Sequence, residues 1–438
     1  MKKRNLFTSL VKFVDLQNIS GILLLITTLG AMIMANSNFA DDYFRFWNTE
    51  IGFSVGESEL IKPLLLWVND GLMAIFFFLI GLEIKREVLL GQLNSIRKIM
   101  FPLVGALGGI IFPVLFFFVL NSNPETVSGW GIPMATDIAF SLAVLNVLGK
   151  RVPLSLKIFL TAFAIVDDLA AVMVIALFYS SSIQIGVLIW ALGLLLVTYF
   201  VSYKGFYSHP FIVIMGAIIW FLFLESGIHP TISGVLMAFA IPVKQRVGLQ
   251  VFLRRMRSFA NNFRTSKSVS EPILTKEQLS LVKRQRNWLK YFESPLQRWE
   301  EILRTWVSVV IIPIFALANA GVSITDTEHM EMGLITTIAL CLFLGKSIGI
   351  SSAVLISKKL KFIQVPRDIG IKEIIGVSFI AGIGFTMAIF IATLAFVNNP
   401  EYIDSAKIGI LVGSLASAFT GYFLLRSSKK KDDLLEGV

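Results

Sequence analysis

Two adjacent aspartates, Asp167 and Asp168, lie in the middle of an apolar stretch that runs from residue 158 to residue 179. A segment of this length can cross a bilayer, because about 20 helical residues at about 1.5 Å each span its hydrocarbon core. An aspartate at that depth costs roughly 2.5 to 3.5 kcal/mol, and a second carboxylate beside it adds repulsion between like charges. The pair therefore requires protons, a cation or a basic partner, and the rest of the chain must supply them.

The composition is that of a polytopic membrane protein. Of the 438 residues, 55% are hydrophobic and 16% are charged, whereas a soluble globular chain carries about 25% charged residues. The formal net charge of +10 would raise the question of nucleic acid in a soluble protein. Here the basic residues cluster in short segments between apolar runs, where they act as topology signals, so no nucleic-acid partner is expected. The one cysteine, Cys341, can form no internal disulfide.

Twelve apolar segments predict twelve transmembrane helices. The first follows a basic N-terminus as a signal peptide would, but its apolar part is longer and begins later, so we expect an uncleaved first span. The segments lie near residues 19–36, 61–82, 99–120, 129–149, 156–179, 183–202, 210–224, 228–243, 303–321, 332–356, 372–397 and 405–426.

Lys and Arg concentrate in alternate loops, as expected of loops that face the cytoplasm. The long segment 244–304, with fourteen Lys or Arg against five Glu, is the largest of these. Both termini are therefore predicted to be cytoplasmic. The resulting division is a cytoplasmic N-terminus at 1–18, helices one to eight at 19–243, a basic cytoplasmic connection at 244–302, helices nine to twelve at 303–426 and a cytoplasmic tail at 427–438.

The basic connection is predicted to be partly helical from residue 276 to residue 303. Its excess of positive charge makes anionic lipid a candidate partner.

Two of the predicted helices contain helix breakers. The fourth opens with GWGIPMATD, and the eleventh contains AGIGF near its middle. Interrupted helices at corresponding positions of two halves indicate a transporter site built from half-helix ends. If spans three to five and ten to twelve are inverted repeats, spans four and eleven correspond.

The predicted topology brings four ionisable side chains to the middle of the membrane. Asp137 lies about eight residues into span four and Asp168 about ten residues into span five, which is roughly 12 to 15 Å deep in a core of about 30 Å. Lys346 in span ten is also central, and Thr136 lies beside Asp137. Asp167 and Asp168 project about 100° apart on a helix, so one can face Lys346 while the other faces an ion path.

Carboxylates, a threonine hydroxyl and the carbonyls of a broken helix form an all-oxygen site, which suits a hard cation such as Na⁺ or Li⁺. The histidines, His209, His229 and His329, lie near span ends without the spacing of metal ligands. Asp70 in span two is suited to line an entry path.

Seven motifs between spans two and eleven resemble the NhaA family of bacterial Na⁺/H⁺ antiporters. The combination of ATDIAF with the DD pair is specific. The motifs are WVNDGLMAIFFFLIGLEIKRE, PMATDIAFSLAVL, LTAFAIVDDLAAV, GIHPTISGV, FALANAGV, GKSIGI and AGIGFTMAIFIATLAF.

This resemblance implies the family's inverted-repeat fold and a role for each central residue. Asp168 resembles the principal ion-binding carboxylate, and Asp167 its neighbour, which pairs with Lys346; Na⁺ would bind at these two aspartates. Thr136 and Asp137 resemble the residues that balance the dipoles of the broken helices.

The resemblance also implies a pH response near the cytoplasmic funnel, at positions matching Glu83, Glu87, His229 and Glu300. For Glu83 and Glu87, solvated loop charges are the alternative, and for His229 a purely structural role is favoured. The long basic segment before Glu300 departs from the family pattern, so details of pH sensing do not transfer with the resemblance.

The expected function is therefore electrogenic, pH-regulated exchange of internal Na⁺ or Li⁺ for external protons by alternating access in a bacterial inner membrane. No cofactor is expected, and a homodimer is left open. One alternative keeps the fold but carries an organic solute, against which the absence of a central Arg, or of a central Lys besides Lys346, argues. Another is an intramembrane aspartyl protease, but the Tyr-Asp and Gly-x-Gly-Asp motifs of such enzymes are absent, so we expect no enzyme.

Overall fold

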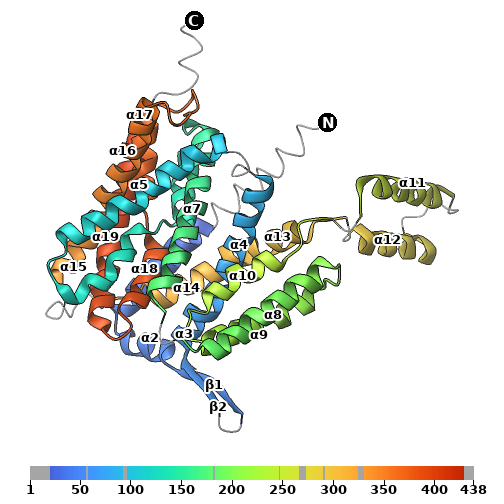
Figure 1. The fold of residues 1–438 in the computed structure, drawn as a ribbon, viewed down its shortest axis with the longest axis horizontal. Coiled ribbons are helices and arrows are strands. Elements are labelled where there is room, and N and C mark those ends of the chain that lie inside the picture. Colours follow the sequence, from blue (N-terminus) through green and yellow to red (C-terminus); the bar gives the residue numbers. More distant parts are fainter. Residues whose placement is uncertain are drawn as a thin grey trace, which may run out of the picture.

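The computed structural model describes residues 20–55, 58–91, 96–180, 183–245, 247–265, 273–289, 292–323 and 330–428. Within these ranges the chain is almost entirely helical, with one two-stranded sheet. The helices form one bundle, from which a β-hairpin and a pair of helices project (Figure 1). His329, the segment 1–18 and the tail beyond residue 428 lie outside the described residues.

Seven of the described helices are long and apolar enough to cross a membrane. Several are continuous helices that contain a short π-helical turn. They are Leu64–Leu90 (α3 Leu64–Trp67, η1 Val68–Leu72, α4 Met73–Leu90), Ile99–Leu120 within α5 (Ile96–Leu120), α7 (Leu154–Phe178), α8 (Ile185–Tyr203), Pro295–Asn319 (α13 Pro295–Trp306, η5 Val307–Ile311, α14 Ile312–Asn319), Met332–Lys359 (α15 Met332–Leu340, η7 Cys341–Gly345, α16 Lys346–Lys359) and α19 (Pro400–Arg426).

Spans four and eleven are interrupted, as their glycines predicted. In span four the 3₁₀ helix η3 (Pro124–Met134) meets α6 (Ile138–Val147) at 48°, and in span eleven α17 (Ile371–Ala381) meets α18 (Phe385–Ala395) at 43°. These breaks expose backbone groups at the half-helix ends, deep in the bundle.

The other predicted spans are also helical. Ser20–Ala35 turns by 115° into the short helix α2 (Ala40–Trp47), and α9 (His209–Glu225) and α10 (Thr231–Ala240) are shorter apolar helices. If each bent pair is one span, the described residues contain up to ten spans by length and composition, and α9 and α10 fall at the seventh and eighth predicted segments.

Three features differ from the sequence-based expectation. Strands β1 (Glu50–Val55) and β2 (Ser58–Pro63) form an antiparallel hairpin, so span two begins at Leu64 and not at residue 61. The ninth span begins at Pro295 and not at residue 303, because Pro295 suits the first turn of a helix. The segment before it contains a helix that was not predicted, α11 (Leu249–Thr265), whereas α12 (Lys276–Leu289) lies within the stretch 276–303 that was predicted to be partly helical.

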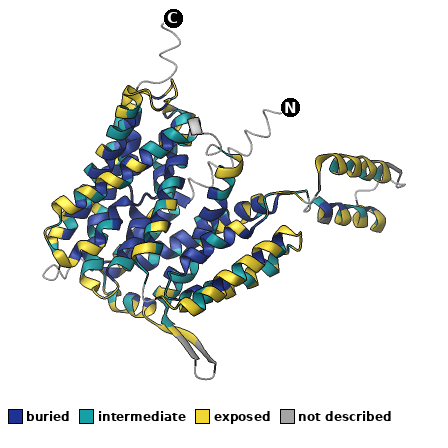
Figure 2. Ribbon diagram, viewed as in Figure 1, coloured by how far each residue is buried: buried dark blue, intermediate teal, exposed yellow. Residues whose placement is uncertain are grey.

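Buried residues gather in the centre of the bundle, whereas exposed residues follow the outward faces of its helices (Figure 2). Many exposed side chains are large and apolar, such as Trp190, Leu177 and Val119. A surface of this kind is unstable in water but suits the hydrocarbon of a bilayer. The broken helices meet at the centre of this bundle, where Asp137, Asp167, Asp168 and Lys346 are buried.

Candidate functional site

The breaks in spans four and eleven lie against each other and are joined by hydrogen bonds. The backbone N–H of Asp137 donates to the carbonyl of Ile383 at 2.7 Å, and the Thr136 hydroxyl donates to the carbonyl of Ala381 at 3.0 Å. The Thr136 bond satisfies a carbonyl at the end of α17, which the helix itself cannot satisfy.

Asp137 accepts hydrogen bonds from the N-termini of two half-helices. Its Oδ1 accepts from the backbone N–H of Phe140 in α6 at 3.0 Å. Its Oδ2 accepts from Thr386 in α18, from the backbone N–H at 3.1 Å and from the hydroxyl at 2.6 Å. Because a helix N-terminus carries partial positive charge, this one carboxylate is stabilised by both α6 and α18.

Lys346 occupies the opposite electrostatic position. Its side chain has no exposed surface, and Nζ donates to the carbonyl of Met134, the last residue of η3, at 2.5 Å. A cation there complements the partial negative charge of a helix C-terminus. Nζ also lies 3.0 Å from Oδ2 of Asp167 in α7. The other oxygen of Asp167, Oδ1, is buried and has no hydrogen-bond partner among the described residues.

Asp168 has different surroundings from Asp167, although it is the next residue in α7. Its side chain is buried and, within the described part of the chain, makes no hydrogen bond or ion pair. It lines a cavity of about 490 Å³ together with Thr136, Asp137 and Thr386. The chain thus holds one aspartate on a lysine and leaves its neighbour open to a cavity.

The same cavity extends to a cluster of ion pairs that contains three of the predicted pH-response residues. Arg304 Nη2 lies 3.0 Å from Glu83 Oε1 and also pairs with Glu300. Arg86 Nη1 lies 3.2 Å from Glu300 Oε1, and its Nη2 lies 2.8 Å from Glu87 Oε1. Glu83, Arg86 and Arg304 line the cavity.

The two arginines of this cluster were missed by the sequence reasoning. A signal existed, because Arg86 follows Glu83 by three residues and Arg304 follows Glu300 by four, spacings that place side chains on one face of a helix.

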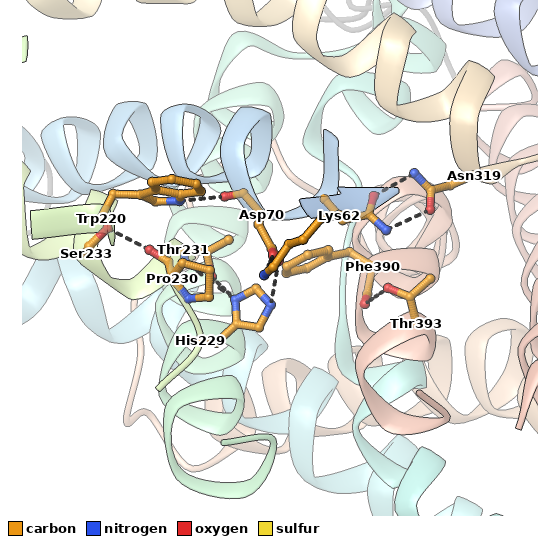
Figure 3. A network of polar contacts seen from close by, with 11 residues as sticks. Lys62, Asp70, Trp220, His229, Pro230, Thr231, Ser233, Asn319, Phe390 and Thr393 are labelled. Carbon is orange, nitrogen blue, oxygen red and sulfur yellow. Dashed lines mark hydrogen bonds and ion pairs between the residues drawn. The ribbon is translucent and has the colours of Figure 1, made fainter. Parts of the chain in front are cut away.

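His229 lies outside that cluster, in a different polar network, and its role in a pH response stays a prediction. Its Nε2 lies 3.8 Å from Asp70 Oδ1, and Lys62 Nζ lies 3.2 Å from Asp70 Oδ2 (Figure 3). The Trp220 indole donates to the Asp70 carbonyl at 3.1 Å. Neither Asp70 nor His229 lines the cavity that contains Asp168. The sequence alone could not show that His229 and Glu300 belong to different networks, because the packing of α10 against α4 decides which side chains His229 meets.

An aromatic side chain of α18 packs beside His229. Phe390 follows Thr386 by one helical turn of α18 and is buried without exposed surface. Its ring centroid lies 5.4 Å from that of His229, 5.8 Å from that of Phe77 and 6.2 Å from that of Phe315. Figure 3 shows Phe390 beside the Asp70 network. Phe390 therefore contacts His229, the neighbour of Asp70, and belongs to the same helix as the cavity-lining Thr386.

The donor atoms of the site are oxygens. Among the described residues, no group of three or more His, Cys, Asp or Glu side chains could hold a metal ion. Asp167 Oδ1, the Asp168 carboxylate and the Thr136 hydroxyl instead offer the ligands that hard monovalent cations prefer.

Comparisons with known proteins identify one family along almost the whole chain. A family model described as Na⁺/H⁺ antiporter 1 matches residues 11–425. The Na⁺/H⁺ antiporter NhaA of Oleidesulfovibrio alaskensis is 42% identical over 420 residues, which cover 95% of this chain and 93% of the relative. The NhaA protein of Helicobacter pylori is 41% identical over 425 residues, covering 97% of this chain and 96% of the relative.

A further NhaA protein, from Bacteroides fragilis, is 40% identical over 425 residues and covers 95% of this chain and 97% of the relative. Among solved structures, the sodium proton antiporter MjNhaP1 from Methanocaldococcus jannaschii aligns over 96% of this chain and 97% of its own, with a TM-score of 0.45 and 12% identity. The family model and the relatives establish that this chain belongs to the Na⁺/H⁺ antiporter 1 family.

Proposed function

We propose that this multi-pass membrane protein exchanges Na⁺ or Li⁺ for protons across a bacterial inner membrane, and that Asp168 is the carboxylate that binds the two ions in turn. Both termini are proposed to be cytoplasmic, because Lys and Arg concentrate in both terminal segments and in the alternate loops between them. The cavity would then open toward the cytoplasm, since Glu83, Arg86 and Arg304 belong to the helix ends next to basic segments.

The observation that supports this most strongly is the contrast between the two aspartates. Asp167 has a permanent counter-charge, because Lys346 Nζ lies 3.0 Å away. Asp168 has no ion-pair or hydrogen-bond partner within the described residues and lines the cavity. A buried carboxylate without a partner must take up a proton or a cation. Because both require the same oxygens, binding of one ion displaces the other.

The proposed Na⁺ ligands come from α7 and from the break in span four. Asp168 would supply the charge, and Thr136 and Asp167 Oδ1 would supply further oxygens. Asp137 and Lys346 hold the half-helix ends in place through hydrogen bonds to backbone groups. We therefore propose that they position the site and do not contact the Na⁺ ion directly. We infer that the frame of the site is pre-formed, since Asp137 and Lys346 are held by bonds at the half-helix ends.

Alternating access would require the cavity to close on one side and open on the other. Asp70 does not line the cavity that contains Asp168, so Asp70 is proposed to line the external path. Rearrangement of α18 against α6 would move Thr386 and Phe390 together, because both belong to α18. The ion-pair cluster of Glu83, Glu87 and Glu300 is proposed to tune exchange with pH.

The test is Na⁺-driven proton movement in proteoliposomes that contain the purified protein, followed with a pH-sensitive dye. Asp168→Asn is expected to insert and fold but to abolish exchange, because the amide keeps the shape of the side chain and cannot ionise. The matched control is Asp404→Asn, the same change at a side chain that is 44% exposed, which should exchange normally. Full exchange by Asp168→Asn would refute the assignment.

A further inference from the structure

A helical hairpin, α11 and α12, stands apart from the membrane-spanning bundle. Figure 1 shows it beside the start of α13 and beyond the ends of α8 and α9. Its two ends are joined at the bundle. The Ser294 hydroxyl donates to the carbonyl of Val243 at 2.7 Å, and the Leu296 N–H donates to that of Pro242 at 3.2 Å. The hairpin is therefore an arm attached at one point, between α10 and α13.

The two helices of the arm pack on each other through a seam of their own. The rings of Phe252 and Trp288 stack with centroids 5.7 Å apart, and Gln285 Nε2 lies 2.9 Å from the sulfur of Met256. The guanidinium of Arg255 lies 4.6 Å above the Trp288 ring. The seam uses mainly the apolar faces, and Arg255 is the one basic side chain among these contacts.

The outward faces carry almost only positive charge. α11 contains no Asp or Glu, and α12 contains one, Glu277. The exposed basic side chains of the two helices are Arg254, Arg255, Arg257, Lys276, Lys283, Arg284 and Arg286.

Exposed leucines lie beside this charge. Leu249 is 59% exposed, Leu253 48% and Leu279 42%. Leu253 directly precedes Arg254 in α11, and Leu279 lies one turn before Lys283 in α12. Basic residues interleaved with exposed leucines on a helix are typical of segments that lie on an anionic membrane surface.

We propose that the α11–α12 arm binds the anionic lipid surface of the membrane beside α8 and α9. The argument rests on charge complementarity and on place. The arm projects sideways from the bundle, and its attachment point lies at helix ends. From there the lipid head groups around the bundle are within its reach. Lys and Arg side chains would contact lipid phosphates, and the leucines would enter the interface between head groups and acyl chains.

Lipid binding by the arm is connected to the cavity through α13. The hydrogen bonds of Ser294 and Leu296 lie at the start of α13, the helix that carries Glu300 and Arg304. Arg304 lines the cavity and pairs with Glu83. A force on the arm therefore acts on the first turn of α13. We infer that anionic lipid changes the exchange rate through this connection.

The binding test uses the full-length protein with a single added cysteine, Ser280→Cys, on the exposed side of α12, labelled with an environment-sensitive fluorophore. The native Cys341 is buried, so the unsubstituted protein measures background labelling. In vesicles of phosphatidylcholine with phosphatidylglycerol the emission should shift to the blue relative to vesicles of phosphatidylcholine alone. High salt should remove the shift, because it screens charges beyond about 3 Å at about 1 M.

The arm variant replaces Lys276, Lys283 and Arg286 with Gln and should abolish the shift. The matched control replaces Lys358, Lys359 and Lys361 with Gln. This removes the same charge from an exposed segment that is also predicted to face the cytoplasm, and it should keep the shift. An emission that is the same in both vesicle types, or a shift that survives in the arm variant, would refute lipid binding and leave a protein partner as the alternative.

The exchange assay then tests the connection to α13 separately. Wild type and the Lys358, Lys359 and Lys361 control should change their exchange rate by the same factor when phosphatidylglycerol is added, whereas the arm variant should not respond to it. Equal lipid responses in all three would refute the connection. Loss of Na⁺/H⁺ exchange in the wild type would instead count against the proposed function, while the fluorescence result would stand unchanged.

Discussion

Lys346 Nζ and Asp167 Oδ2 lie 3.0 Å apart with neither side chain exposed, and they join α16 to α7 across 179 residues of sequence. The same ammonium group donates to the carbonyl end of η3 at Met134. One cation therefore neutralises an aspartate and caps a broken helix, so its loss should affect both the fold and the ion site.

Lys346→Ala should lower stability by about 3 to 5 kcal/mol, because it leaves Asp167 buried without its counter-charge. Lys346→Arg keeps the charge and should lose less. The matched control, Lys407→Ala, removes a lysine whose partner Asp404 is 44% exposed, and it should cost no more than about 1 kcal/mol. Thermal unfolding in detergent measures the three, and equal Tm values for the Ala and Arg variants would argue against a stabilising pair.

Thr386→Val should lower the free energy of unfolding by about 1 to 3 kcal/mol. It removes the hydroxyl that donates to Asp137 Oδ2 at 2.6 Å and so leaves this buried carboxylate with one hydrogen bond fewer. Thr386→Ser should restore most of the loss. Thr336→Val serves as the control, because that hydroxyl is exposed and bonds only to its own helix. If Thr386→Val and Thr336→Val unfold at the same temperature, the Thr386 bond contributes nothing.

Gly349→Ala should separate α5 from α16 and lower both stability and exchange. An added Cβ would lie 2.2 Å from the carbonyl oxygen of Gly108, and such overpacking costs typically about 1 to 3 kcal/mol. Because Lys346 lies one turn earlier in α16, the shift would reach the ion site. Gly193→Ala, where no neighbouring atom lies within 4 Å of the added carbon, should behave as wild type. Wild-type Tm and exchange for Gly349→Ala would show that the helices tolerate the methyl group.

The apparent affinity for Na⁺ should fall with decreasing pH if Na⁺ and protons compete for Asp168. Each proton that must leave before Na⁺ binds raises the apparent dissociation constant about tenfold per pH unit, which is about 1.4 kcal/mol. One displaced proton gives a log-log slope of about one. Two protons, released from coupled groups that include Asp167 or Lys346, give a limiting slope of about two and make the exchange electrogenic.

The measurement is the Na⁺ concentration for half-maximal exchange between about pH 5 and pH 9. Asp404→Asn is again the matched control and should give the wild-type slope. An affinity that does not change with pH, accompanied by a change in maximal rate alone, would mean that protons act at a separate regulatory site.

Sequence by itself determined the span positions and the depth of the charged residues. Hydrophobic length fixed where helices such as Leu154–Phe178 begin and end to within a few residues. The glycines of GWGIPMATD and AGIGF predicted the two interruptions, because they lie within otherwise apolar helices. The depths of Asp137, Asp168 and Lys346 followed from residue counting along those helices.

Local sequence was a weaker guide outside the membrane core. The ninth span was predicted to begin at residue 303 and not at Pro295, because charged residues such as Glu300 and Arg304 interrupt the apolar pattern. Their ion pairs with Glu83 and Arg86 appear only in the folded structure. The β-hairpin was not predicted at all. These elements depend on partners that are distant in the chain.

Residue spacing left open which aspartate meets Lys346; the family resemblance implied Asp167, and the tertiary structure supplies the physical reason. Residue spacing places Asp167 and Asp168 about 100° apart on α7, and this allows either of them to face the lysine. The contacts of α7 with α5, α6 and α4 fix its rotation, so that Asp167 reaches Lys346 and Asp168 reaches the cavity. The same packing separates His229 from Glu300 and lets Asp137 cap two helices. Spacing along a helix sets the depth of a residue, whereas the direction of its side chain is set by the helices packed around it.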